Sequence, residues 1–270
     1  MRIGNREFDL NNNTYIMGIL NVTPDSFSDG GKFNILSEAL RHTEQMIQEG
    51  VDIIDIGGES TRPNYTHISD AEEIDRILPI IKEVKKQFDV PISVDTYKSE
   101  VATAALSNGA DFINDIWGLK HDQRMANVVK EFNVPVCLMH NRKEAVYNNY
   151  MEDVINDLKE SIQLALDAGI NKDKIIIDPG IGFAKTYEMN LTLMNRLEQL
   201  HQLELPILLG TSRKSMIGLT LDEPVTNRLE GTIATTVMGV MKGCSIVRVH
   251  DVLANRRAIT MTQTILREKK

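Results

Sequence analysis

The sequence is poor in cysteine and in aromatic residues, and it contains no long apolar run. Among 270 residues there are 2 cysteines and 5% aromatic side chains. Cys137 lies in the apolar run PVCLM and Cys244 in MKGCSIV, so we expect two buried free thiols in a reducing compartment and no disulfide. No run approaches the roughly 20 apolar residues that cross a bilayer, and the first 14 residues lack the apolar core of a signal peptide. These absences predict a cytoplasmic protein.

The sequence also has fewer basic than acidic residues. The 30 Lys and Arg residues are outnumbered by 38 Asp and Glu residues, which gives a net charge of −8 and a pI near 5.3. Nucleic acids and anionic membranes are bound by basic faces, so this balance argues against both as partners. A local group of Arg and Lys side chains can still bind a small anion. With 42% hydrophobic residues, the chain is long enough to bury a large core, and we expect one domain over residues 1–270.

The chain repeats one pattern eight times: a short apolar run rich in β-branched residues, a polar loop, and a longer amphipathic stretch. The expected strands are 15–21, 51–58, 91–96, 111–116, 135–140, 174–180, 206–212 and 245–251. The expected helices are 35–50, 69–88, 99–109, 122–133, 150–169, 189–203, 228–243 and 254–266. Eight strand–helix units predict an α/β fold, the (β/α)8 TIM barrel.

An open doubly wound sheet is the competing fold. It normally has five to seven strands and often a GxGxxG turn after the first strand, which this sequence lacks. The first 14 residues do not fit the repeat. Their Gly4-Asn5 pair and the Asn cluster at 11–13 suggest a short N-terminal hairpin that covers the bottom of the barrel.

Every expected strand ends in a residue that can bind or react. In a TIM barrel the active site lies at these strand ends. Any one such residue has the alternative role of a turn former or helix N-cap, and that alternative stays open for Asp55 and Asp115. Eight sets on one rim nevertheless predict a site, and they are Asn21, Asp55 with Glu59, Asp95, Asn114 with Asp115, His140, Asp178, the run Ser212-Arg213-Lys214, and Arg248 with His250.

The polar residues form two chemical groups. Asp95, Asn114 and Asp178 offer carboxylate and amide oxygens, which suit the N–H edge of a flat, nitrogen-rich heterocycle or, alternatively, a divalent metal. The second group is cationic and suits a phosphate or diphosphate; its members are Arg62, Lys214, Arg248 and His250. We therefore expect a ring pocket beside an anion-binding wall.

Two long polar loops follow the first two expected strands. NVTPDSFSDGG starts at Asn21 and GGESTRPNYTHIS at Gly57. Both are long for barrel loops, so we interpret them as flaps that close over a substrate, with plain surface connections as the alternative. Asn21 together with phosphate oxygens can complete a Mg²⁺ shell, because Mg²⁺ is usually held by few protein oxygens plus substrate phosphates and water.

Taken in order, the motifs resemble those of the dihydropteroate synthase family. They are ILNVTPDSFSDGG, GGESTRP, SVDT, IND, LMH, DPGIGFAK, TSRKS and RVHD, and they run through nearly the whole chain. The resemblance implies that 4-aminobenzoate displaces pyrophosphate from 6-hydroxymethyl-7,8-dihydropterin diphosphate. It also implies participation of Mg²⁺, a homodimer and inhibition by sulfonamides.

The resemblance also assigns roles to individual residues. Those expected to bind the pterin are Asp95, Asn114, Asp178 and Lys214, with Ile116 and Met139 as apolar walls. Those expected at the diphosphate are Thr61, Arg62, Arg248 and His250, with Asn21 meeting Mg²⁺. Those expected to frame the aminobenzoate are Phe27, Pro63, Gly182, Phe183, Lys214 and Ser215, with Asp29 supporting the closed first loop. The residues expected to take part in catalysis are Asp29, Arg62, Lys214, Arg248 and His250.

Two departures from the family pattern bear on inhibitor contacts. Asn64 stands where Gly is common after STRP, and Met216 stands where Phe is common after RKS. Two alternatives to the synthase stay open, namely a pterin-binding methyltransferase domain and a catalytically silent pterin-binding barrel. The methyltransferase needs neither the NVTPDSF loop nor the diphosphate-binding Arg62 and Arg248, so these features favour the synthase.

Overall fold

Eight parallel strands form the centre of the molecule in the computed structural model, which describes residues 1–23, 32–59 and 67–268. The strands are β3 (Tyr15–Asn21), β4 (Ile53–Gly57), β5 (Ile92–Asp95), β6 (Phe112–Asp115), β7 (Val136–Met139), β8 (Ile175–Asp178), β9 (Leu208–Leu209) and β10 (Ile246–Val249). Their order in the sheet is β8-β7-β6-β5-β4-β3-β10-β9. A parallel bridge between Ile177 and Ile207 joins the two edges. The predicted (β/α)8 barrel is confirmed.

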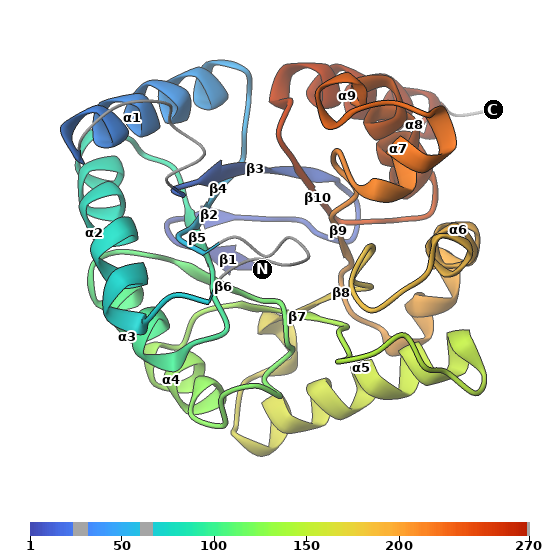
Figure 1. Cartoon of the computed structure of the whole chain (residues 1–270), viewed down its shortest axis with the longest axis horizontal. Helices are drawn as coiled ribbons and strands as arrows, with labels where there is room; N and C mark the ends of the chain where they lie inside the picture. Colours follow the sequence, from blue (N-terminus) through green and yellow to red (C-terminus); the bar gives the residue numbers. More distant parts are fainter. Residues whose placement is uncertain (24–31, 60–66, 269–270) are drawn as a thin grey trace.

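Helices form a ring around these strands (Figure 1). They are α1 (Lys32–Gln48), α2 (Asp70–Gln87), α3 (Ser99–Ser107), α4 (Met125–Phe132), α5 (Tyr150–Asp167), α6 (Tyr187–Asn195), α7 (Ser215–Leu221), α8 (Leu229–Met241) and α9 (Val252–Leu266). Apolar side chains of the helices pack against outward-facing residues of the strands in the largest core cluster. Among the described residues, no helix is both long and apolar enough to span a bilayer.

Two helical regions differ from the sequence-based expectation. The helix expected over 189–203 changes at Arg196 from α6 to a 3₁₀ segment, η3 (Leu197–Leu203). Leu197, Leu200 and Leu203 are buried, and this spacing of three matches the three residues per turn of a 3₁₀ helix. The short helix α7 was not expected, and it begins directly after Lys214.

A hairpin at the N-terminus covers the bottom of the barrel, as predicted. Strands β1 (Arg2–Ile3) and β2 (Arg6–Glu7) pair antiparallel, and Gly4 in the turn has φ +59°. Ile3 and Phe8 are buried in one cluster with the lowest inward-facing residues of the barrel, such as Met17. Burial of each such side chain contributes about 1.5–3 kcal/mol.

Inward-facing side chains change from apolar to polar along several of the strands. On β6, Phe112 belongs to the bottom cluster, and Asn114 follows two residues later. On β8, Ile176 belongs to the same bottom cluster, and Asp178 follows two residues later. Because side chains alternate between the two faces of a strand, the spacing of two places both members of each pair inside the barrel. The polar members therefore meet at its C-terminal end.

Candidate active site

Arg248 lies at the centre of the polar end of the barrel. Its Nε donates to Asp55 Oδ2 at 2.6 Å, and its Nη2 donates to Asp95 Oδ2 at 2.7 Å. Asp55 also accepts from Ser93 Oγ at 2.5 Å and from Asn114 Nδ2 at 3.3 Å. The acceptor group and the cationic group predicted from sequence are therefore joined through Arg248.

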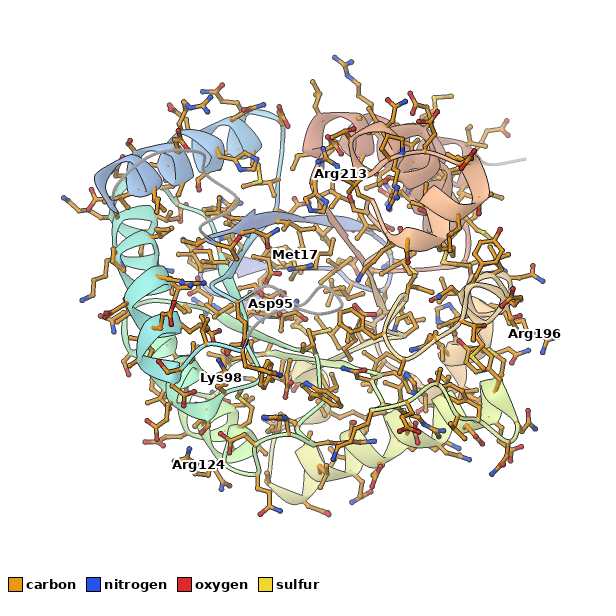
Figure 2. The ribbon with its side chains drawn as sticks, in the orientation of Figure 1. Met17, Asp95, Lys98, Arg124, Arg196 and Arg213 are labelled. Carbon is orange, nitrogen blue, oxygen red and sulfur yellow. The ribbon has the colours of Figure 1, made fainter. Side chains whose placement is uncertain are left out.

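Asp95 brings a carboxylate oxygen into this site with capacity to accept a further hydrogen bond. Its side chain is 8% exposed, and Figure 2 shows it near the centre of the ring of strands. Oδ1 is buried and has no hydrogen-bond partner among the described residues. A buried carboxylate oxygen normally has a donor, so this atom marks a position where a ligand N–H can bind.

Asp178 supplies the second buried carboxylate. Its side chain is held from behind, because the amide of Gly180 donates to Oδ1 at 2.6 Å. A Cβ atom placed on Gly210 would lie 3.8 Å from Asp178 Oδ2. A glycine at this point therefore leaves space next to the carboxylate.

Burial shifts the pKa of both carboxyl groups. It raises the pKa of Asp95 to about 7, with the charge of Arg248 opposing the shift. It raises the pKa of Asp178 to about 6, opposed by the Gly180 amide and by Lys214. The pKa of Arg248 is raised by Asp55 and Asp95, against the effect of burial. A cation and a N–H donor would both favour the ionised carboxylates.

Lys214 and Phe183 are in contact at the same end of the barrel. Lys214 Nζ lies 4.2 Å from the centre of the Phe183 ring, within the range of a cation–π contact. Burial lowers the pKa of Lys214 to about 8, and the charge of Arg248 lowers it further. Gly182 lies against the same lysine, since a Cβ there would be 3.3 Å from Lys214 Cδ. Ser215 begins α7 and is exposed.

An apolar cluster contains Ile116 and Met139, the two residues predicted as pterin walls. Ile116 and Met139 are each 5% exposed and cluster with Tyr97, and Trp117 and Phe183 pack against this cluster. The contact places apolar side chains from three loops beside the carboxylates.

His250 contacts Ser212, in the loop that follows β9. Its Nδ1 is 2.9 Å from Ser212 Oγ, and its amide donates to the same oxygen at 3.2 Å. The neighbouring Arg213 points elsewhere, because its guanidinium forms two hydrogen bonds with Asp251 at 2.7 and 3.1 Å. Of the run Ser212-Arg213-Lys214, Arg213 therefore forms an ion pair with Asp251.

Asn21 ends β3 on the same rim, where it pairs with Gly57 of β4. A Cβ atom placed on Gly57 would lie 3.8 Å from Asn21 Oδ1 and 3.9 Å from Asp95 Oδ2, so two oxygen donors flank this glycine. Among the described residues, no group of three or more His, Cys, Asp or Glu side chains is arranged to hold a metal. Asp95 Oδ2 is already bound by Arg248, so Asn21 Oδ1 is the oxygen that fits a Mg²⁺ ion, which takes most of its ligands from substrate and water.

Several predicted residues lie outside the described part of the chain. They are Phe27, Asp29, Thr61, Arg62 and Pro63, together with the departure at Asn64 and most of both loops interpreted as flaps. Their assignments stay predictions. The base of the second loop is described, and there Glu59 accepts from the amide of Ile68 at 3.2 Å and pairs with the ammonium of Lys98 at 2.9 Å.

Asp55 is a site residue that sequence reasoning left with two possible roles. The turn alternative holds for Asp115, whose carboxylate accepts from the amides of Trp117 and Leu119 at 2.8 Å each. It does not hold for Asp55, which is fully buried and bonded to Arg248. The sequence feature that could have predicted this role is its position in β4, two residues before Gly57. This spacing places the Asp55 side chain on the inward face of the strand.

A second polar cluster lies beside these residues, and of its members the sequence predicted only His140, from its position at a strand end. His140, Asp157 and Lys185 are linked by hydrogen bonds. Burial lowers the pKa of His140 to about 4 and that of Lys185 to about 7, and the charge of Asp157 opposes both shifts. The sequence feature that could have indicated this cluster is Lys185, which ends the motif DPGIGFAK and had no assigned role.

Comparison with known proteins agrees with this geometry. The family model for pterin binding enzymes matches residues 17–250. The chain is 60% identical over 268 residues to the dihydropteroate synthase of Clostridium beijerinckii, covering 99% of this chain and 100% of that protein. Both share the full length of the barrel.

Solved structures of similar proteins contain ligands. A dihydropteroate synthase from Clostridium difficile, crystallised in the presence of pteroic acid, matches with a TM-score of 0.95 and 50% identity, covering 97% of this chain and 100% of that one. The Yersinia pestis dihydropteroate synthase with a sulfonamide drug complex matches with a TM-score of 0.93 and 40% identity, covering 99% of each chain.

Proposed function

This chain belongs to the dihydropteroate synthase family of pterin-binding enzymes, and we propose how its residues carry out the family's reaction. The protein is a transferase of folate synthesis. It condenses 6-hydroxymethyl-7,8-dihydropterin diphosphate with 4-aminobenzoate to 7,8-dihydropteroate and releases pyrophosphate. The proposal concerns the role of each side chain, the metal, the oligomeric state and the location.

The observation that carries the assignment of the ring pocket is the buried Asp95 Oδ1, which has no partner among the described residues. The N–H edge of the pterin donates to Asp95 and Asp178, and Asn114 supplies both a donor and an acceptor. The ring lies against Ile116 and Met139. Burial makes these hydrogen bonds strong, because water does not compete for the same atoms.

The diphosphate leaves the pterin methylene with the electron pair of the broken C–O bond. Negative charge then grows on the leaving group, and the side chains of Arg62, Arg248 and His250 stabilise it, with the hydroxyl of Thr61 as a further donor. Positive charge is delocalised over the methylene and the ring. Asp29 supports the closed loop and favours this cation.

Mg²⁺ is part of the proposal, with Asn21 as its protein ligand. When bound, the ion adds positive charge next to the diphosphate oxygens. The support is the hard oxygen donor at the end of β3, on the rim that also carries Arg248 and His250. The chain's own contribution at this point is to hold Asn21 Oδ1 at the rim through the pairing of β3 with β4.

The aminobenzoate is held next to the methylene by side chains from several loops. They are Phe27, Pro63, Gly182, Phe183, Lys214 and Ser215. An aniline nitrogen is a weak nucleophile, and correct placement of the reacting atoms contributes more than a strong base would. Lys214 organises the two substrates and forms no covalent bond with either. Sulfonamides compete for the same position.

A homodimer is the proposed assembly. The support is a set of exposed apolar side chains on the neighbouring helices α8 and α9, which are Met241, Leu253, Met261, Ile265 and Leu266. Exposed apolar groups at this density are typical of protein interfaces. Sedimentation of the purified protein as a dimer supports this assembly, and sedimentation as a monomer at micromolar concentration rejects it. The proposed location is the cytoplasm, supported by two cysteines that are free and buried.

The experiment that tests the function is incubation of the protein with the pterin diphosphate, 4-aminobenzoate and Mg²⁺, followed by measurement of pyrophosphate release. Release that requires 4-aminobenzoate and is inhibited by a sulfonamide supports the proposal. Folded protein that releases none contradicts it. The variant Arg62→Ala tests the diphosphate assignment, since unchanged kinetics would place the diphosphate elsewhere.

A further inference from the structure

The ammonium of Lys185, in the loop between β8 and α6, has three hydrogen-bond acceptors around it. Its ammonium lies 2.8 Å from His140 Nδ1, 2.9 Å from the carbonyl oxygen of Gly180 and 2.9 Å from that of Phe183. In its charged form, a lysine has three N–H donors, and three acceptors are present around Lys185. The match in number and distance indicates a residue built into the loop rather than a solvated charge.

The His140 ring is oriented by the carboxylate of Asp157, which is itself held by Arg142. His140 Nε2 lies 3.0 Å from Asp157 Oδ2, and the guanidinium of Arg142 holds the same carboxylate at 2.5 and 3.1 Å. The low pKa of His140 keeps its ring neutral at pH 7. A neutral ring that accepts from Lys185 at Nδ1 must donate from Nε2 to Asp157. One tautomer therefore satisfies every partner.

The two carbonyl acceptors belong to backbone that forms the active site. Gly180 donates from its amide to Asp178, the carboxylate assigned to the pterin. Phe183 donates from its amide to the Gly180 carbonyl at 3.1 Å, and its ring lies against Lys214. One ammonium thus clamps both ends of the turn that places Asp178 and Phe183.

The turn at residues 180–183 is tightly packed, so any movement of it would break the hydrogen bonds to Lys185. Gly180 has φ +70°, and a Cβ atom there would lie 2.0 Å from the carbonyl oxygen of His140. The loop backbone therefore lies directly on the end of β7. If the ammonium were removed, the Phe183 carbonyl and His140 Nδ1 would lose this donor, and the Gly180 carbonyl would keep only the amide of Phe183. The loop would then move to find new donors.

We propose that Lys185 is a positioning residue for the transferase reaction, which clamps residues 180–183 so that Asp178 and Phe183 face the two substrates. The inference rests on the proposed roles of Asp178 and Phe183 in substrate binding. Lys185 itself contacts neither substrate. It acts through the loop backbone, with His140 and Asp157 as its support.

The main test compares Lys185→Met with the wild-type enzyme. Methionine keeps the unbranched chain as far as Cε and removes the ammonium group with its three donors. We expect the KM for both substrates to rise and kcat/KM to fall about 10- to 100-fold, the scale of misplacing reacting groups by about 1 Å. We expect Lys185→Arg to recover part of the loss because it keeps donors and charge. Amide hydrogen exchange of residues 179–186 should be faster in Lys185→Met.

Lys242→Met is the matched control. Lys242 is also a partly buried lysine that donates to a backbone carbonyl, that of Asn195 at 2.8 Å, and it pairs with Glu198. It lies outside the site, so its removal should change neither KM. If Lys185→Met folds and keeps the wild-type KM values and kcat, or loses only thermal stability as the control does, the proposal is overturned.

A second pair of variants tests the same contact without altering Lys185, in case Lys185→Met does not fold. His140→Asn keeps a side-chain oxygen to accept from Lys185, whereas His140→Leu does not. We expect a larger rise in both KM values for His140→Leu, and equal constants for the two would overturn the proposal. Pteroic acid binding by calorimetry and the exchange of residues 179–186 do not need turnover. They test the clamp even if the wild-type enzyme fails to release pyrophosphate, an outcome that would reject the proposed function instead.

Discussion

Arg248 Nη2 donates a 2.7 Å hydrogen bond to Asp95 Oδ2 and leaves the other carboxylate oxygen of Asp95 for a ligand. This contact links the residue assigned to the diphosphate with a residue assigned to the pterin. The charge on Arg248 opposes the effect of burial on the pKa of Asp95. Binding of the leaving group and binding of the ring are therefore coupled through one guanidinium.

The first prediction concerns Asp95→Asn. The substitution removes the charged acceptor for the pterin and weakens the partner of Arg248, so we expect kcat/KM for the pterin diphosphate to fall about 10- to 100-fold, as for the loss of a charged hydrogen bond. The wild-type kcat/KM should decline as the pH falls below about 7, because protonation of Asp95 removes its acceptor charge. Steady-state kinetics from pH 5.5 to 9 measure both effects. A variant with wild-type kcat/KM at pH 8 would contradict the assignment.

The second prediction concerns stability and Asp178. Burial raises its pKa from 3.8 to about 6, so the folded state binds this proton more tightly than the unfolded state does. The resulting stability is complete below pH 3.8 and is lost as the pH rises through 6. Above pH 7 the ionised, buried carboxylate costs about 3 kcal/mol by this linkage.

Asp178→Asn removes that cost and keeps an oxygen for the Gly180 amide. We expect its Tm at pH 8 to exceed that of the wild type by roughly 5 °C, and the difference to vanish below pH 4, while pterin binding is lost. Differential scanning calorimetry at both pH values measures it. Asp173→Asn, at an exposed position in η2 (Lys172–Lys174), serves as the control and should change neither value. An Asp178→Asn protein that is less stable at pH 8 would show the interpretation to be wrong.

The third prediction concerns Lys214, whose pKa is lowered to about 8 by burial and by Arg248. The wild-type kcat/KM should decline as the pH rises above about 8, because the lysine loses the charge that contacts the substrates. Lys214→Arg keeps its charge over this range. We expect this variant to be about 10-fold less active at pH 7, owing to the different shape of the guanidinium, and to show no decline up to pH 9.5. An unchanged alkaline decline would assign it to another group.

The fourth prediction concerns Asn21 and Mg²⁺. Asn21→Ala removes the proposed protein ligand, so the Mg²⁺ concentration for half-maximal activity should rise about 10-fold. Asn21→Asp keeps an oxygen at this point and should remain close to the wild type. Titration of Mg²⁺ in the pyrophosphate assay measures the change. Asn227→Ala, which alters an exposed residue bonded to Glu223, is the control, and an equal effect of both alanine variants would reject Asn21 as the ligand.

The sequence predicted more of the backbone than of the contacts. Short apolar runs located all eight strands, and the polar strand ends drew attention to Asp95, Asn114 and Asp178, whose roles stay predictions. Helix α7 was not predicted, because the run Ser212-Arg213-Lys214 directly before it was interpreted only as the polar end of a strand. The change from α6 to η3 at Arg196 was missed because a leucine at every third residue fits both kinds of helix over a short stretch.

The barrel, its N-terminal hairpin and the family were determined by the sequence itself, because short apolar runs and motif order are local properties. Only the tertiary structure decided which polar groups share a partner. Arg248 and Asp55 are 193 residues apart, and Lys185 and His140 are 45 apart. Their hydrogen bonds exist only because closure of the barrel brings the strand ends together, within the few ångströms over which a hydrogen bond acts.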